Sequence, residues 1–404
     1  FCLAVLVGEG ARRKWALPGY SADTVMAKDR VRAAAGAAMA SEIAGRHSKR
    51  FLNEEETLLW GFWIALFSAY ALIGGFSLTS LAGLRYYLAA LPLAVVVPHL
   101  LRDWDDLRRM VSMSLYVTIG ICILGFVQYA STPDSVINQY AWTTADQGIA
   151  TFGLEDDREI VVGFDRARIT VTFSYISTYA SFLQFMFLVA WVAALTSRTG
   201  GERVVAFVTL LAVFTNIAMT GSRSPTLVAT MVSIPFTVLL MRQRRSGVFQ
   251  AGIALAVVAT LAGGLYALSD PVAMLLLRDG GAGDAEERIF GAIWVPITTL
   301  SSASWLGDGI GSTFGGLVEL GITSSVGSGF DEINLDRLGI ETGIIGYLVI
   351  LLVKTVYVVK TGALFIDARN FDIRVWTLAI LGYQLGLLLT IPLYNSVASA
   401  FYFV

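Results

Sequence analysis

Histidine and cysteine are nearly absent from this chain, with two residues of each type among 404 positions. Cys2 and Cys122 both lie in apolar stretches, where a cysteine usually packs as a small hydrophobic side chain. His47 and His99 lie in different segments. The scarcity excludes a histidine or cysteine metal cluster, so we expect no cofactor and no such metal. Only an all-oxygen cation site stays open.

Charge is also scarce, because Asp, Glu, Lys and Arg make up 15% of the residues while hydrophobic residues make up 55%. The mean hydropathy is +0.66. This balance excludes an ordinary soluble domain, which needs more polar surface. The apolar residues gather into blocks of roughly 18 to 25, the length with which a helix crosses a bilayer. Long uninterrupted blocks predict helices rather than barrel strands, and so an all-α integral membrane protein.

Ten segments are predicted to lie in the membrane, the first of them too short to span and so expected to be a helix truncated at its start. We do not interpret that first segment as a signal peptide. The predicted segments are 1–7, 57–77, 83–101, 110–130, 171–196, 203–220, 225–241, 248–268, 343–361 and 374–394.

If successive connections between these segments lie on alternate sides of the membrane, the Lys and Arg residues are distributed unevenly between the two sides. Of the 29 Lys and Arg residues, 21 fall on the face that holds residues 12–56, and 8 fall on the other face. Cationic connections stay in the cytoplasm, so the first face is predicted to be internal. The outer face then carries two long loops, 131–170 and 269–342, the second with short helices, on a single polytopic membrane domain, 1–404. Residues 30–50 form either an interfacial helix or a solvated linker.

Arginine on the outer face runs against the positive-inside tendency. Arg168 precedes an apolar run, Arg223 lies in the turn 221–225, and Arg288 lies in the large loop. Such residues can snorkel to water or pair with acidic residues of the outer loops. Alternatively, they bind the phosphates of a lipid-linked substrate, because the guanidinium fork matches phosphate oxygens bidentately.

An acidic stretch precedes the predicted span 343–361. Asp331 and Glu332 open it, and Glu341 closes it. A carboxylate here is a candidate general base for a sugar hydroxyl if burial or a like charge raises its pKa. The alternative is a solvated acidic loop. The glycines of 307–311 superficially suggest a nucleotide loop, but no strand pattern flanks them, so we expect no nucleotide site.

Motif-like pieces are scattered over nearly the whole chain. They are Glu9-Gly10 with Arg13-Lys14-Trp15 through Pro18, Leu124 to Tyr129 leading to Asn138, Arg168 through Thr172-Phe173-Ser174-Tyr175, Gly221-Ser222-Arg223, Gly307 to Gly311, and Glu341 with Gly343. In their order and their placement against the spans, these pieces resemble landmarks of the O-antigen ligase and polymerase superfamily, in particular its bacterial exopolysaccharide polymerase-like members.

The resemblance implies a GT-C-like membrane glycosyltransferase of the bacterial inner membrane, with its active face outside the cytoplasm. Its substrate would be undecaprenyl-diphosphate-linked oligosaccharide, used without a nucleotide sugar or a metal. Membrane lipids and other polysaccharide-assembly membrane proteins are the further partners implied. Arg168 and Arg223 fall where the family places phosphate-binding arginines, and Arg288 is a looser match.

One departure from the family bears on the type of enzyme. Ligases of this superfamily carry a histidine shortly before the Glu-x-Gly of the next span, and this chain has Asp331-Glu332-Ile333-Asn334 there. The departure favours a polymerase-like enzyme with Glu332 or Asp331 as the base. The alternatives are a ligase that transfers glycan to a lipid or protein, a relative that has lost catalysis, and a structural subunit of a membrane complex. A transporter is disfavoured, because no repeat is visible and mid-helix charges are few.

Overall fold

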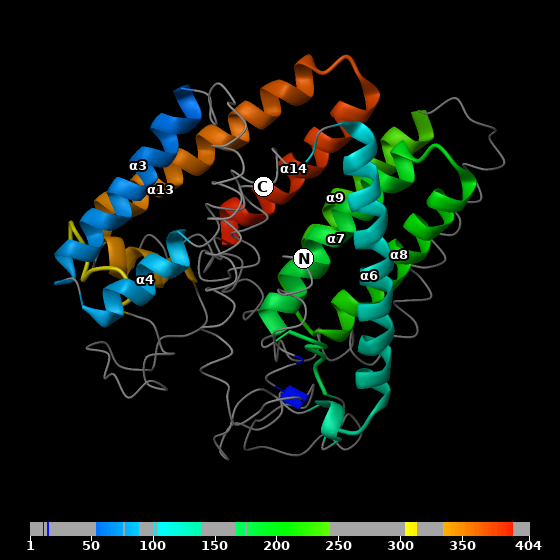
Figure 1. Ribbon diagram of the computed structural model, residues 1–404, viewed down its shortest axis with the longest axis horizontal. Helices are drawn as coiled ribbons and strands as arrows, with labels where there is room; N and C mark the ends of the chain where they lie inside the picture. The colour runs from blue at the N-terminus through cyan, green and yellow to red at the C-terminus, as the bar shows by residue number, and fades with distance from the viewer. Residues whose placement is uncertain are drawn as a thin grey trace, which may run out of the picture. The chain divides into compact units, whose positions relative to one another are not determined.

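The computed structural model describes residues 11, 14, 15, 54–75, 77–88, 101, 103–133, 135–138, 167–173, 176–242, 304–312 and 334–390 (Figure 1). These residues form helices and connecting segments, with no β-strand among them. The helices are α3 (Glu54–Ile73), α4 (Leu78–Leu88), α6 (Trp104–Ala130), the 3-10 turn η3 (Val136–Asn138), α7 (Ile176–Thr196), α8 (Gly200–Met219), α9 (Arg223–Arg242), α13 (Asn334–Asp367) and α14 (Phe371–Thr390).

Four of the described helices are long and apolar enough to cross a membrane: Trp104–Ala130, Ile176–Thr196, Gly200–Met219 and Leu338–Asp367. The chain is therefore a helical, multi-pass membrane protein, as its composition predicts. Of the other predicted segments, helices cover residues 57–73, 83–88, 225–241 and 374–390. The predicted segments 1–7 and 248–268 lie outside the described residues, and so does most of 83–101.

The helix starts differ from the prediction by a few residues, and two of the differences involve irregular backbone. Helix α7 begins at Ile176 rather than at 171, because residues 167–173 form an irregular segment. Helix α13 begins already at Asn334, within the predicted outer loop, and Gly343 interrupts it with φ 63° and ψ −172°. Glycine adopts this backbone conformation without the steric cost that a Cβ would bring.

Two compact units emerge from the tertiary contacts, and each combines stretches that are distant in the sequence. The first unit comprises 1–24, 103–284 and 362–383, and the second comprises 25–102, 285–361 and 384–404.

In the first unit, α7 lies at the centre of a helix bundle and packs against α6, α8 and α9 (Figure 1). Of its most apolar 18 residues 83% are buried, compared with 28% for α6. Aromatic stacking supports the centre, since the rings of Trp191 and Phe236 lie 5.8 Å apart with an interplanar angle of 15°. Helix α6 therefore leaves an apolar face for lipid.

Helix α6 packs tightly against α8 at Gly125. A Cβ at this glycine would lie 1.9 Å from Oδ1 of Asn216. The Asn216 amide donates to the carbonyl of Cys122 (3.3 Å), and its Oδ1 accepts from the Tyr179 hydroxyl (2.9 Å). Asn216 is 0% exposed, so these bonds satisfy a polar group within the apolar bundle.

Replacing Gly125 by alanine is expected to lower the apparent Tm of the detergent-solubilised protein by on the order of 5 °C, because overpacking displaces Asn216 from its partners. Gly120→Ala is the matched control, since Gly120 lies in the same helix and a Cβ there would meet nothing within 4 Å. Equal melting temperatures for the two variants would contradict the close packing of α6 against α8.

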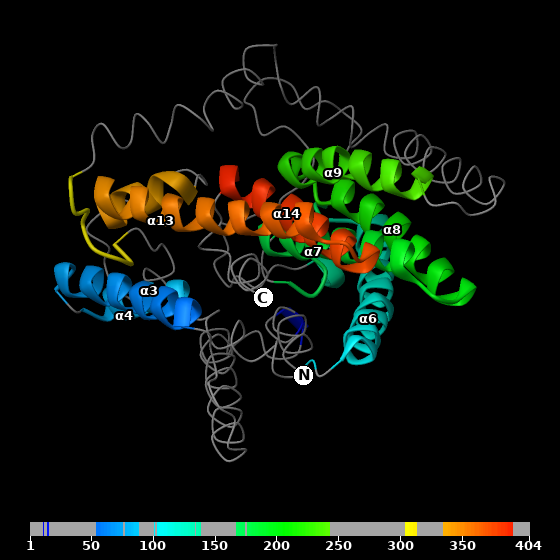
Figure 2. The same cartoon turned by 90° about the horizontal axis from the view of Figure 1, so that it is seen from above.

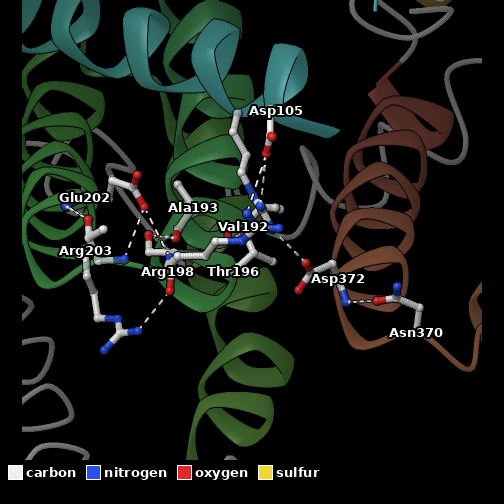
Figure 3. Close-up of polar contacts among 12 residues, drawn as sticks. Asp105, Val192, Ala193, Thr196, Arg198, Glu202, Arg203, Asn370 and Asp372 are labelled. Carbon is white, nitrogen blue, oxygen red and sulfur yellow. Dashed lines mark hydrogen bonds and ion pairs between the residues drawn. The ribbon is translucent and has the colours of Figure 1, made fainter. Parts of the chain in front are cut away.

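At the end of the bundle where α6 begins, charged residues link three parts of the chain (Figure 3). These are the start of α6, the connection from α7 to α8, and the start of α14. Arg108 donates to Asp372 at 3.1 Å, and Arg198 lies 3.6 Å from Asp105. Thr199 and Glu202 form a reciprocal capping box at the start of α8. The charge count predicts that these connections share one face, and the ion pairs bring them together.

In the second unit, α3 and α4 lie side by side in both views (Figures 1 and 2). Their aromatic residues pack with α13 in one cluster. Trp63, Phe67 and Tyr87 contribute from α3 and α4, and Tyr347 and Ile350 contribute from α13. Phe67 and Tyr87 stack with ring centroids 4.2 Å apart. This cluster forms the base on which a glycine-rich segment docks.

Candidate functional site

The segment 167–173 is an irregular stretch of backbone that is largely buried. Ala167, Ile169, Val171 and Phe173 are each no more than 2% exposed. The N–H of Ile169 donates to the carbonyl of Met219 at the end of α8 (3.4 Å). Irregular backbone at membrane depth is tolerated where protein covers it or where it lines a polar cavity. The sequence predicts a span from residue 171, so this segment corrects that boundary.

Arg168 lies in this segment, and its guanidinium reaches the end of α8. Its Nε donates to the carbonyl of Thr220 (2.9 Å), and its Nη2 donates to that of Gly221 (3.5 Å). Carbonyls at a helix C-terminus have no partner within the helix, and a cation there also complements the helix dipole. The guanidinium is thereby held at the turn from α8 to α9.

Arg223 is the first residue of α9, directly after this turn. Ser222 precedes it and donates its backbone N–H to the Thr220 hydroxyl (3.2 Å). Pro225 lies in the first turn of α9, where a missing N–H costs no helical hydrogen bond. The N-terminus of α9 carries the positive end of the helix dipole. The turn therefore combines the Arg168 guanidinium, a helix N-terminus and the Arg223 backbone.

Polar side chains from other parts of the chain hydrogen-bond to the segment 167–173 and to one another. Lys14 donates to the Thr170 hydroxyl and to the carbonyl of Val171 (2.9 Å). Gln128 accepts from the N–H of Val171 (2.7 Å), and Asn138 donates to the carbonyl of Gln128 (3.1 Å). We name Lys14, Gln128, Asn138 and the segment 167–173 the loop support. Most of its members lie in the sequence pieces on which the predicted resemblance rests, but only their contacts reveal what they do.

A second polar site lies in the other unit, around Glu341 in α13. Its carboxylate is 0% exposed and accepts a hydrogen bond from the Tyr87 hydroxyl at 2.8 Å. The backbone N–H of Asp308 donates to the carbonyl of Ile340 (2.8 Å), and that of Gly309 donates to the carbonyl of Glu341 (3.1 Å). These bonds tie α4 and the segment 304–312 to the kink at Gly343. Glu341 holds this junction together and is closed to solvent.

No family model, no curated protein and no solved structure matches this chain. The superfamily resemblance therefore stays a prediction.

The predicted site residues are placed unevenly. Arg168 and the backbone of Arg223 come together at the α8–α9 turn, although 55 positions separate them in the sequence. Arg288, Asp331 and Glu332 lie outside the described residues. The sequence predicts no role for Lys14, Gln128 or Tyr87. For Gln128, a usable signal is a polar residue inside an apolar helix, where an amide needs a partner.

Proposed function

We propose that this chain is a polysaccharide polymerase-like glycosyltransferase that joins undecaprenyl-diphosphate-linked glycan repeats at the outer face of the bacterial inner membrane. The observation that carries the proposal is the α8–α9 turn, where the Arg168 guanidinium is held by the carbonyls of Thr220 and Gly221, just after α8 and just before Arg223. Both arginines match family landmarks for phosphate binding. A guanidinium held at a helix N-terminus whose first residue is a second arginine suits a diphosphate.

The proposed reaction follows from this arrangement. An acceptor sugar hydroxyl attacks the anomeric carbon of the lipid-linked glycan, and the bond from that carbon to the diphosphate oxygen breaks. Arg168, Arg223 and Arg288 would stabilise the charge that develops on the departing diphosphate. Glu332 or Asp331 would accept the proton of the hydroxyl. The enzyme would be GT-C-like and independent of metal and of nucleotide sugars.

The sidedness of the bundle supports an outer location for this turn. Connections rich in cations meet at the other end, where Arg108 pairs with Asp372 and Arg198 with Asp105. Cationic connections remain cytoplasmic, and α8 is long enough to cross the membrane. The α8–α9 turn would then face the compartment where lipid-linked glycans are assembled.

Deleting the chain from its host is expected to leave lipid-linked single repeat units in place of polymer. The measurement is mass spectrometry of extracted diphosphate lipids, with the restored wild-type chain as control. Lipid-linked polymer of normal length would instead identify a ligase, because elongation would have occurred without this protein. Unchanged glycan and lipid profiles would contradict both enzymatic assignments.

A further inference from the structure

Val171 has a backbone conformation that its side chain disfavours. Its φ is 51°, and it is the one non-glycine residue with positive φ in the part of the chain that the structure describes. A left-handed conformation is disfavoured about 5- to 30-fold for an L-residue, and more strongly for a β-branched one. Val171 is 0% exposed. Strain of this kind persists only where the surroundings enforce it.

Two side chains hold both polar backbone groups of Val171. Gln128 Oε1 accepts from its N–H at 2.7 Å, and Lys14 Nζ donates to its carbonyl at 2.9 Å. The Gln128 amide nitrogen donates to the carbonyl of Ile137 at 2.6 Å, which fixes the orientation of the amide. Lys14 is 3% exposed and Gln128 is 1% exposed. A buried ammonium needs hydrogen-bond acceptors, because burying a charge without a partner is costly. The bond from Lys14 to the Val171 carbonyl is therefore a strong constraint on the backbone at Val171.

The constraint on Val171 extends to Arg168, which lies on the same short segment. Between them, the N–H of Ile169 bonds to Met219, and Lys14 bonds to the hydroxyl of Thr170. We propose that Lys14 and Gln128 are positioning residues that clamp Val171 in its left-handed conformation and so set the Arg168 guanidinium at the α8–α9 turn. This inference rests on the proposed function, in which Arg168 binds the diphosphate.

The test compares Lys14→Met, Val171→Gly and the double variant in nanodiscs, with Lys360→Met as a control at an exposed lysine. The rate of hydrogen–deuterium exchange in peptides covering 167–173 measures how firmly the segment is held. The rate of polymerisation of undecaprenyl-diphosphate-linked oligosaccharide measures whether the active site depends on it. Lys14→Met is expected to raise exchange about tenfold, because the left-handed penalty is no longer offset. It is also expected to lower kcat about 10²-fold, as misplacement of a binding group does.

Val171→Gly is the reference for the double variant, because glycine adopts positive φ readily while the loss of a buried side chain has its own cost. In the double variant it should restore most of what Lys14→Met loses. If Lys14 instead bound phosphate itself, the double variant would stay inactive and the KM for the donor would rise, which would overturn the positioning role. Normal exchange in Lys14→Met would overturn the clamp. A wild-type protein without turnover would refute the proposed function, while the exchange measurement would still decide whether the clamp exists.

Discussion

Replacing Arg223 by alanine is expected to abolish polymer while leaving the protein folded in the membrane. The structure fixes the Arg168 guanidinium on the carbonyls of Thr220 and Gly221, directly before Arg223. Loss of one preorganised group that stabilises developing charge typically costs about 10²–10³ in rate. The fall in polymer yield should therefore be at least about 10²-fold. Gel analysis of the glycan, normalised to the purified amount of each variant, measures it.

Two further variants sharpen this test. Arg223→Lys keeps the charge but loses the planar fork, so it should restore little of the polymer. Arg198→Ala removes a cation from the opposite end of the same bundle, where its ion pair with Asp105 has side chains that are 67% and 65% exposed. Exposed pairs contribute little to stability, so this control should make normal polymer. Normal polymer length and yield from Arg223→Ala would contradict the proposal that Arg223 binds phosphate.

Gly311→Ala is expected to destabilise the second unit by about 3 kcal/mol or more. Gly311 has φ +83°, and a Cβ there would lie 2.1 Å from the carbonyl oxygen of Thr79. The left-handed penalty and the backbone displacement act together, since the obstructing atom belongs to the main chain. We expect a lower apparent Tm and faster proteolysis of α3 and α4, measured on the detergent-solubilised protein.

The matched control for this variant is Gly61→Ala in α3. A Cβ at Gly61 meets nothing within 4 Å, and alanine is the better helix former. Its Tm should equal or exceed that of the wild type. A Gly311→Ala protein with wild-type Tm and proteolysis would show that the segment 304–312 does not dock on α4 as described.

Much of the fold could be predicted from the sequence, because it depends on the lengths of apolar runs. The apolar run 110–130 predicts α6, and the cation count predicts that the connections around Arg108 and Arg198 share a face. Helix starts were less predictable. Val171 reads as an apolar residue at the head of a span, yet its backbone is left-handed, and hydropathy carries no information on φ.

The candidate site was predictable only in its charged residues. Arg168 and Arg223 are unusual for the face that the charge count predicts to be external, but the carbonyls that hold Arg168 are backbone atoms without a sequence signature. Tyr87 and Glu341 lie 254 residues apart, so nothing local predicts their hydrogen bond. The glycines of 307–311 superficially suggest a nucleotide loop, whereas close backbone packing against α13, the end of α3 and α4 accounts for them.

The measurement that tests the central claim most directly uses purified protein in nanodiscs, incubated with undecaprenyl-diphosphate-linked oligosaccharide from the host. Products are followed by gel and by mass spectrometry, with Arg223→Ala run in parallel. We expect ladders of repeats and released undecaprenyl diphosphate from the wild type, and neither from the variant. A wild-type protein that neither binds nor elongates this lipid would contradict the account and favour a structural subunit.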